Sequence, residues 1–534
     1  MKAYKARRPR EESRLLFGLA PAFHQSQVTS YGSLFFIWSI MAPVSRRSSL
    51  LMSDIATTLP PRRPPGPRGL PVVGTSFMAS RDSTQTLTRW ARDYGDIVYY
   101  RFFDFRFYVL FHPQHIEQVL LGKTGNFVKG ITSRANPELF GNGLLTSDGD
   151  FWRRQRRLSN PAFHRESIVR YADITTEEAA RLLEGWNGET RNIHNDMMNI
   201  TLRIVLRSLF GSGLGESMKV IEPALEAIMV SSSGFHSIAF FLGIPTPTRA
   251  RHFRAVREID SVVYALIARG REKLKSGEGR AADPERQTAG GAKDLLTLLL
   301  TARDDDGNSM SDQQLRDEVI TLLLAGHETT ALNLSWTWYL LAQYPEVEKK
   351  LHAELDAVLG GQPPCAADLP KLQYTDRVIR ETLRLYPPAW RIFRRTQEPF
   401  TVGEYVLPAG SNIVLSQWVT QRDPRWFSEP DRFYPDRWSE EAAAKLPRFA
   451  YFPFGGGPRV CIGAGFAMME ATLLLATIAQ RFRMRLAPNQ RIEPLASITL
   501  RPKNGIRVEL EERAPARVAP IAPAKSAPTN VASA

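Results

Sequence analysis

The most regular hydrophobic pattern in the chain runs from Ser311 to Gln343. Ser311 and Gln314 form the Ser-x-x-Gln pattern of a capping box, and Pro345 ends the pattern. These limits predict one helix of about 33 residues, roughly 50 Å long. Its middle, Leu322–Trp336, is strongly apolar, so we expect this helix to cross the whole domain and to be buried there.

Short β-branched and aromatic stretches predict small sheets elsewhere in a mostly helical chain. Residues 95–111, "GDIVYYRFFDFRFYVLF", are typical of a β-hairpin, and further strands are expected within 399–415, 497–502 and 506–510. Residues 276–293 are polar and glycine-rich, which predicts a loop between helices. The pattern therefore favours a mainly α protein with small β-sheets, of the α+β class.

The first sixty residues do not resemble a folded core. The apolar run Leu34–Val44 is eleven residues long, whereas a membrane span needs about twenty. A signal peptide, a peripheral membrane anchor, a transit segment and a spurious extension upstream of Met52 all remain open. Membrane contact is therefore an option without a convincing span.

Proline-rich segments separate both ends from the body of the chain. Residues 60–71, "PPRRPPGPRGLP", predict a stiff hinge that leads into the globular part. The Ala/Pro-rich end has the composition of a disordered tail. The expected organisation is an N-terminal extension over 1–59, a single domain over 60–512 and a tail over 513–534.

Composition and charge exclude several classes. The chain has 534 residues, 43% hydrophobic and 23% charged, which is typical of a globular protein. Its formal net charge is +14, yet no basic and aromatic interleaving suggests nucleic-acid binding. A basic face for an acidic protein partner and a diffuse excess of charge are the two alternatives. Only two cysteines, Cys365 and Cys461, argue against a disulfide framework or a zinc site and favour a reducing compartment.

One of these cysteines lies in an unusual loop, "FGGGPRVCIGAG", from Phe454 to Gly465. Helix-forming residues begin directly after Cys461, so its sulfur should lie near a helix N-terminus, which favours an anion. The glycines remove side chains where a flat ligand would approach, and Arg459 offers a cation for a carboxylate. These features suit a thiolate ligand of haem iron, with Arg459 near a propionate. The alternative is a buried cysteine in a glycine turn.

The complete string resembles the haem-binding loop of the cytochromes P450, Phe-x-x-Gly-x-Arg-x-Cys-x-Gly. The segment "ETLR" is similar to the Glu-x-x-Arg of that family, and "FYPDRW" carries an arginine in the place of its third partner. The resemblance implies that Glu381, Arg384 and Arg437 form a structural network beside the haem. A solvated ion pair between Glu381 and Arg384, three residues apart on a helix, is the alternative.

"AGHETT", Ala325–Thr330, is similar to the family signature in the long central helix. We expect Thr329 and Glu328 to loosen the backbone ladder, to hold a water and to deliver protons to dioxygen at the haem. The alternative has Thr329 bonding back to its own helix and Glu328 reaching solvent. His327 should face away from the iron.

The resemblance also implies contacts to haem and substrate. Trp152 and Arg156 of "WRRQR" match a propionate-binding pair, and Arg394 falls where another propionate contact is common. Gln421 replaces a frequent histidine, so no propionate role is transferred to it. The implied iron ligand is Cys461, and the expected cofactor contacts are Trp152, Arg156, Arg394, Arg459, Phe454, Ala325 and Gly463. The expected substrate pocket is Leu322, Ala325, Phe240, Ala389, Ile392 and Ile498.

The implied activity is a haem b monooxygenase that hydroxylates or epoxidises a lipophilic substrate with O2. Fatty acids, terpenoids and carotenoids are the substrate classes considered. About seventy residues follow Cys461, too few for a fused redox domain, so a separate ferredoxin or similar acidic donor with its reductase is expected. A peroxide-using peroxygenase, an isomerase or dehydratase, and a non-enzymatic haem binder are alternatives. We expect a monomer in the bacterial cytoplasm, or a peripheral membrane or organellar protein if residues 1–50 are genuine.

Overall fold

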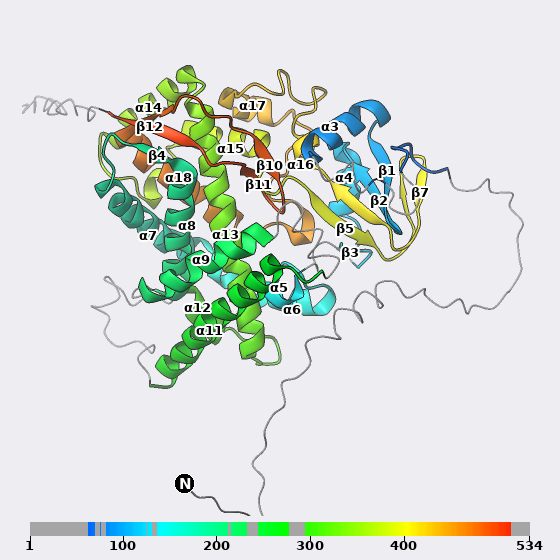
Figure 1. The fold of residues 1–534 in the computed structure, drawn as a ribbon, viewed down its shortest axis with the longest axis horizontal. Helices are drawn as coiled ribbons and strands as arrows, with labels where there is room; N and C mark the ends of the chain where they lie inside the picture. Colours follow the sequence, from blue (N-terminus) through cyan, green and yellow to red (C-terminus); the bar gives the residue numbers. More distant parts are fainter. Residues whose placement is uncertain are drawn as a thin grey trace, which may run out of the picture.

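Figure 1 shows two parts, a large helical part and a smaller part built on a β-sheet. The computed structural model describes residues 62–69, 75, 82–123, 125–130, 136–211, 215–231, 244–276 and 294–513. The predicted N-terminal extension, the loop over 277–293 and the tail after Arg513 lie outside these residues. Arg513 itself is joined to the body, since its backbone N–H donates to the Arg481 carbonyl at 2.8 Å.

Helices make up most of the described chain. They are α3 Ser83–Tyr94, α4 Pro113–Leu120, α5 Pro137–Phe140, α6 Gly149–Ser159, α7 Arg165–Glu184, α8 Ile193–Phe210, α9 Gly215–Ser231, α11 Pro247–Ser276, α12 Leu295–Thr301, α13 Asp312–Leu341, α14 Pro345–Leu359, α15 Gln373–Leu385, α16 Gln417–Thr420, α17 Glu440–Ala443 and α18 Ala464–Arg481. Among the described residues, no helix is both long and apolar enough to span a bilayer.

The strands form four small sheets. They are β1 Ile97–Phe102, β2 Phe105–Leu110, β3 Phe127–Lys129, β4 Thr190–Asn192, β5 Ile392–Thr396, β6 Phe400–Val402, β7 Tyr405–Leu407, β8 Asn412–Leu415, β9 Phe482–Leu486, β10 Pro494–Ala496, β11 Leu500–Pro502 and β12 Arg507–Glu512. The largest sheet has the order β1-β2-β8-β5-β3, the others β4-β12-β9, β6-β7 and β10-β11.

The long helix is confirmed as α13, together with its capping box. Gln314 N–H donates to the Ser311 hydroxyl at 3.2 Å, and the Gln314 side chain accepts from Ser311 N–H at 2.8 Å. The helix ends at Leu341, two residues before the predicted limit, and Pro345 starts α14. It packs against α8, α11, α15 and α18, so it lies in the interior of the helical part (Figure 1).

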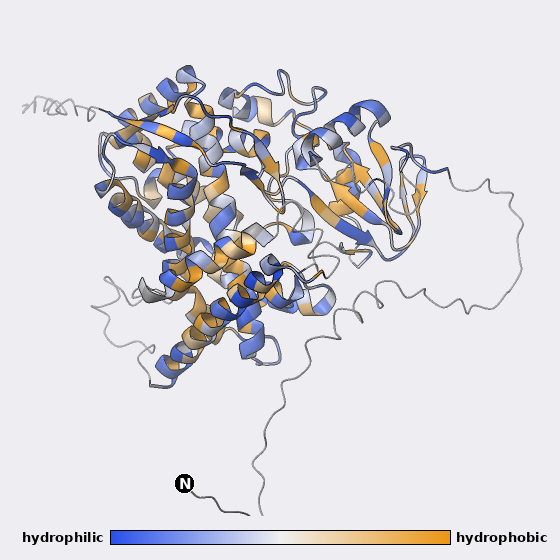
Figure 2. Ribbon diagram, in the orientation of Figure 1, coloured by the Kyte–Doolittle hydropathy of each residue, from blue (hydrophilic) through white to orange (hydrophobic). Residues whose placement is uncertain are grey.

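The predicted hairpin is confirmed as β1 and β2, which pair antiparallel with Tyr99 opposite Tyr108. The parallel pairing of β2 with β8 joins this hairpin to a segment some three hundred residues later in the chain. Figure 2 shows hydrophobic residues along the strands of this sheet, whose buried faces include Val98, Val109 and Val414. Residues of β5, α13 and the start of α18 line one cavity between the sheet and the helices, and this cavity is the candidate site.

Candidate active site

A cavity of about 1180 Å³ lies between α13, α6, β5, the hairpin β1–β2 and the loop before α18. Its walls bring together nearly all the predicted site residues. They are Trp152, Arg156, Leu322, Ala325, Glu328, Thr329, Ala389, Ile392, Arg394, Phe454, Arg459, Cys461, Gly463 and Ile498. Phe240, which was also predicted to line the pocket, lies outside the described residues.

Cys461 lies on the cavity wall, three residues before the first residue of α18. Its backbone N–H donates to the Phe454 carbonyl at 3.0 Å, which closes the loop around the sulfur. Burial raises the pKa of the Cys461 thiol, and a hydrogen bond from Gly463 and the charge of Arg156 oppose this rise only in part. Coordination to a metal ion deprotonates a thiol outright, so an iron bound here would favour the thiolate.

The glycines of the loop are required by neighbouring protein as well as by backbone conformation. Gly455 and Gly457 have φ of 71° and 66°, which disfavours other residues. A Cβ on Gly457 would lie 2.0 Å from the Leu120 carbonyl oxygen, and one on Gly456 would lie 2.2 Å from the Phe449 ring. The sequence argument explained these glycines by a flat ligand alone. The close approach of Leu120, at the end of α4, and of Phe449 is by itself sufficient to require glycine at positions 457 and 456.

Four cations converge on the cavity beside this loop. Arg459 donates to Asp148 at 2.6 Å, and its guanidinium lies 4.3 Å from the Trp152 ring centroid. Burial, together with the charge of Arg459, lowers the pKa of Arg394 to about 10. Burial and the charges of Arg394 and Arg459 also hold the pKa of Lys129 well below its usual value. Lys129 was missed because it carries no motif, and only its pairing opposite Arg394 in β3 and β5 brings it here.

Arg156, the fourth cation, is also tied to the cysteine loop. Its Nη1 donates to the Val460 carbonyl at 2.9 Å, and burial lowers its pKa. One carboxylate, Asp148, offsets this positive cluster among the described contacts. The donor set suits a ligand with two negative charges, such as the propionates of haem, because buried cations are stabilised by paired anions.

The acid–alcohol pair on α13 is arranged differently from the prediction. Thr329 donates its hydroxyl to the Ala325 carbonyl at 2.6 Å, as in the alternative considered for the sequence. The helix is continuous through this turn, so the predicted loosening of its backbone hydrogen bonds is not observed. The Thr329 hydroxyl donates an additional hydrogen bond to a helix carbonyl. Glu328 is buried rather than solvated, and its Oε1 accepts from Thr499 and from Arg501, each at 2.8 Å. Arg501 carries no recognisable motif, so sequence reasoning missed it.

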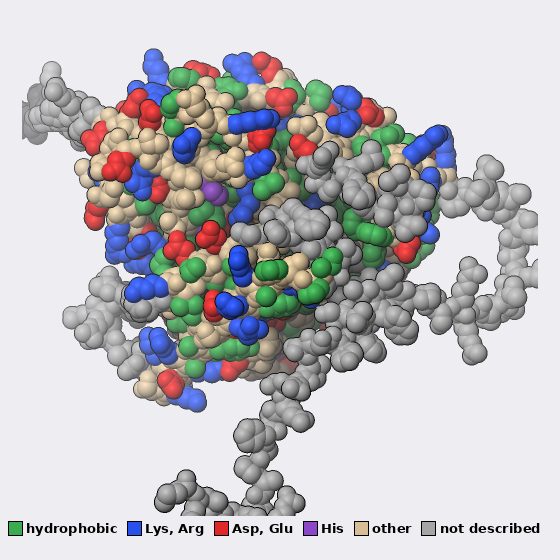
Figure 3. Space-filling view, in the orientation of Figure 1, with side chains coloured by type: hydrophobic (Ala, Val, Ile, Leu, Met, Phe, Trp, Pro, Cys, Tyr) green, Lys and Arg blue, Asp and Glu red, His purple; other side chains and the backbone are tan. Residues whose placement is uncertain are grey.

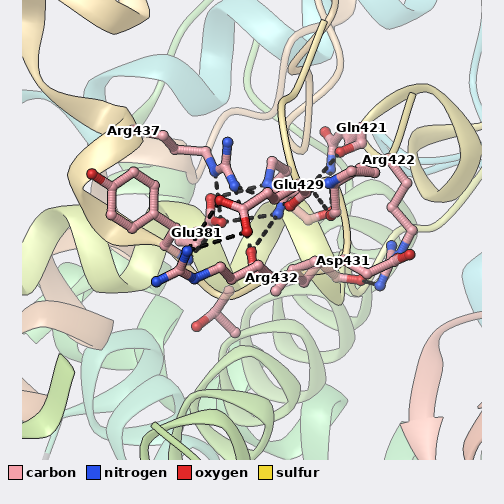
Figure 4. A network of polar contacts seen from close by, with 12 residues as sticks. Glu381, Gln421, Arg422, Glu429, Asp431, Arg432 and Arg437 are labelled. Carbon is pink, nitrogen blue, oxygen red and sulfur yellow. Dashed lines mark hydrogen bonds and ion pairs between the residues drawn. The ribbon is translucent and has the colours of Figure 1, made fainter. Parts of the chain in front are cut away.

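Glu381, Arg384 and Arg437 form the predicted network, and Figure 4 shows Glu381 and Arg437 within it. Arg384 donates to both carboxylate oxygens of Glu381, at 2.9 and 3.0 Å, and Arg437 donates to Oε1 at 2.8 Å. Trp438 Nε1 and Tyr434 N–H complete the acceptor sites of Glu381, at 2.9 and 3.1 Å. Glu381 and Arg384 are fully buried, so the alternative of a solvated pair is wrong.

Gln421 and His327 are bound away from the cavity. Gln421 donates to the carbonyls of Leu383 and Arg384 and accepts from Phe452 N–H at 3.0 Å. It joins the end of α15 to the loop before Cys461. His327 is within 3.0 Å of the Met198 carbonyl, and burial lowers its pKa to about 4. Its direction away from the cavity agrees with the prediction that it is not an iron ligand.

The basic residues of α6 are largely paired with acids. Arg154 contacts Asp304 at 2.6 Å, Arg153 pairs with Asp150, and Arg157 pairs with Asp305. Figure 3 shows Lys and Arg side chains interspersed with Asp and Glu on the face in view. These pairs reduce the positive charge that this segment offers to a partner.

Comparison with known proteins agrees with this geometry. The family model described as "Cytochrome P450" matches residues 64–509. The chain is a cytochrome P450. It is 38% identical over 443 residues to cyclooctatin synthase of Streptomyces melanosporofaciens, covering 81% of this P450 and 92% of the relative. It is 33% identical to pentalenene oxygenase of Streptomyces avermitilis, covering 84% and 97% of the two chains.

Solved structures show the same fold. A cyanobacterial P450 with bound retinoic acid superposes with a TM-score of 0.74 at 25% identity, covering 85% of this P450 and all of that chain. The haem domain of a second cytochrome P450 superposes with the same score. This P450 is therefore a haem-dependent monooxygenase, and its reaction requires a lipophilic substrate, dioxygen and a redox partner.

Proposed function

We propose that this P450 hydroxylates a terpenoid, with electrons from a separate ferredoxin-type donor. The observation that carries the proposal is the apolar cavity beside Cys461, whose walls include Leu322, Ala389 and Ile392. Relatives named for cyclooctatin, cyclooctat-9-en-7-ol and pentalenene support a terpenoid over a fatty acid or carotenoid. In such a cavity, shape and apolar contact would bind a hydrocarbon skeleton and exclude water from the reacting carbon.

We assign haem binding to the residues around the cysteine loop. The sulfur of Cys461 would be the axial ligand, and Arg156, Arg394 and Arg459 would bind the propionates. Haem b is the proposed form, because the sequence contains no Cys-x-x-Cys-His motif for covalent attachment. When bound, haem supplies the activation of dioxygen and the insertion of one oxygen atom into a C–H bond.

Glu328 and Thr329 would supply protons from the α13 side of the cavity. Both contacts to the Glu328 carboxylate end on Oε1, so Oε2 is the atom we assign to proton transfer. Arg501 is partly exposed and would connect Glu328 to solvent. The Thr329 hydroxyl donates to Ala325, so it can accept a further hydrogen bond from a water in the cavity.

The remaining assignments concern the surroundings of the site. Glu381, Arg384 and Arg437 would hold the segments around the haem site in place, because they are hydrogen-bonded to one another and to neighbouring protein groups. A monomer is proposed, and a bacterial cytoplasm is supported by the Streptomyces relatives. Arg153, Arg154 and Arg157 are each paired with an acidic residue, so they offer little free positive charge for docking an acidic electron donor.

Turnover of defined substrates tests the proposal. Purified holoenzyme with a ferredoxin, its reductase and NADPH should convert a cyclic diterpene to a product heavier by one oxygen atom, detected by mass spectrometry. Under ¹⁸O2 the added oxygen should carry the label. Hydroxylation of linear fatty acids but of no terpenoid would overturn the proposed substrate class, and peroxide-driven turnover without any response to the ferredoxin system would overturn the proposed electron source. Cys461→Ser is the control that should abolish turnover.

A further inference from the structure

Arg391 is a cation on the cavity wall with a function not yet explained. It lies between two predicted pocket residues, Ala389 and Ile392, and it lines the same cavity. Its guanidinium carbon is 4.1 Å from the ring centroid of Trp390 and 4.8 Å from that of Phe393. Among the described residues, ring faces are therefore its close contacts, and no carboxylate is paired with it.

The carboxylates of the cavity wall are bound to other groups. Each of the three among the described lining residues has its own partner: Asp82 accepts from Thr84 and Gln85, Glu328 from Thr499 and Arg501, and Glu493 pairs with Arg491 and Lys503. The described residues of the wall therefore provide no free carboxylate for Arg391. Arg391 is half-buried, and a partly buried charge without a protein counter-ion is costly, so its place on the cavity wall indicates an anionic ligand.

Arg391 is also electrically separate from the cations beside the cysteine loop. Arg459 shifts the pKa of both Arg394 and Lys129, whereas among the described residues the titratable neighbour that shifts the pKa of Arg391 is Tyr100. Burial raises the pKa of Tyr100 to about 12, so this group is neutral at physiological pH and is no counter-ion. Arg391 therefore need not serve the haem propionates, for which three other arginines are available.

The ring contacts leave the hydrogen-bonding edge of the guanidinium available. A cation–π contact uses the face of the guanidinium group, whereas its five N–H donors lie in its plane. Two of these donors match the two oxygens of a carboxylate. The aromatic neighbours thus hold the group in position without occupying the donors that a carboxylate would use.

We propose that Arg391 binds a carboxylate of the substrate, so that the natural substrate is a lipophilic carboxylic acid. This inference rests on the proposed monooxygenase function and narrows its substrate class. The carboxylate would lie against Arg391 and Tyr100, while the apolar skeleton extends along Ala389 and Leu322 toward Cys461. Fixing one end of a flexible chain in this way selects which carbon reaches the reactive position.

Binding of matched acids and alcohols to the holoenzyme tests the inference. The probes are geranylgeranoic acid and geranylgeraniol, and hexadecanoic acid and hexadecan-1-ol, with dissociation constants from the haem spin-state shift and from calorimetry. The wild type should bind an acid at least about tenfold more tightly than its alcohol. Arg391→Gln should weaken acid binding about 10- to 100-fold and change alcohol binding less than about threefold. Arg391→Lys keeps the charge without the planar fork and should give an intermediate loss.

Arg395→Gln is the matched control, because Arg395 lies four residues further on, within β5, but is exposed and absent from the cavity wall. It should leave all four dissociation constants unchanged. Equal affinity of the wild type for acid and alcohol would overturn the inference without any variant, as would unchanged acid binding in Arg391→Gln. Either result leaves the terpenoid proposal intact. Arg391-dependent binding of hexadecanoic acid, with no binding of either isoprenoid, would instead support the carboxylate site and overturn the terpenoid skeleton.

Discussion

Replacing Glu381 with glutamine should destabilise the protein far more than a similar change at its surface. Glu381 is fully buried and accepts five hydrogen bonds, two from Arg384 and one each from Arg437, Trp438 and Tyr434. Glutamine has nearly the same size, but it lacks the charge and brings an NH2 group to a position surrounded by donors. The substitution therefore leaves two buried guanidinium groups without their counter-ion.

The structure sets the size of the effect. Removing one partner of a buried ion pair costs about 3–5 kcal/mol, out of a total stability of about 5–15 kcal/mol. Arg384 retains carbonyl acceptors at Gln421 and Pro430, at 2.8 and 2.7 Å, which keeps the loss from the upper end of this range. We therefore expect Glu381→Gln to lower the free energy of unfolding by about 3 kcal/mol.

Glu429→Gln provides the comparison. Glu429 pairs with Arg432 at 3.0 Å, with side chains that are 64% and 49% exposed, so its loss should cost less than about 1 kcal/mol. Urea unfolding of the holoenzyme, followed by far-ultraviolet circular dichroism and by the haem absorption band, gives both values. If Glu381→Gln unfolds within 1 kcal/mol of Glu429→Gln, the buried network does not hold this region together and the argument is refuted.

Four further changes test other parts of the site. Cys461→Ser should remove the long-wavelength band of the reduced carbon monoxide complex, and an unshifted band would exclude sulfur ligation. Glu328→Gln should slow product formation about 100-fold without altering the substrate-induced spectral shift, whereas equal rates would exclude a proton role. Arg394→Gln should release haem to apomyoglobin about tenfold faster; an unchanged rate would argue against a propionate contact. Burial raises the pKa of Glu470 to about 8 from 4.5, so its contribution to stability is complete below pH 4.5 and lost as pH rises through 8. Glu470→Gln should therefore lessen the fall in unfolding free energy between these pH values by a few kcal/mol, and parallel wild-type and variant curves would contradict this.

The sequence correctly predicted helices and strands that are determined by residues close together in the chain. The capping box at Ser311 and Gln314 and the aromatic hairpin β1–β2 depend on neighbours within a few residues, and both were correct. The strands β3, β4, β5 and β9 were not predicted. They are three to five residues long, and most of their hydrogen bonds go to distant segments. Their existence depends on the tertiary fold, which a single-sequence pattern does not contain.

The same distinction holds within the site. Motif residues such as Cys461 and Arg394 were expected at the cavity, and they lie there. The partner of Glu328 was not foreseen, because its contact with Arg501 joins positions 173 residues apart. The helix N-terminus after Cys461 is visible in the sequence, whereas the desolvation that raises the pKa of its thiol depends on packing from the rest of the chain.

The cations beside the cysteine loop also affect how this P450 is assembled. Lys129, Arg156, Arg394 and Arg459 come from β3, α6, β5 and the loop before α18, so they meet only when distant segments close together. Repulsion among these four positive charges opposes that closure, and a bound anion would reduce it. On the proposed assignment the haem propionates would relieve this repulsion, so haem binding would favour the closure of these segments, and the apoprotein should gain stability from added salt far more than the holoenzyme does. The supply of haem would then influence how much of this chain reaches its native state.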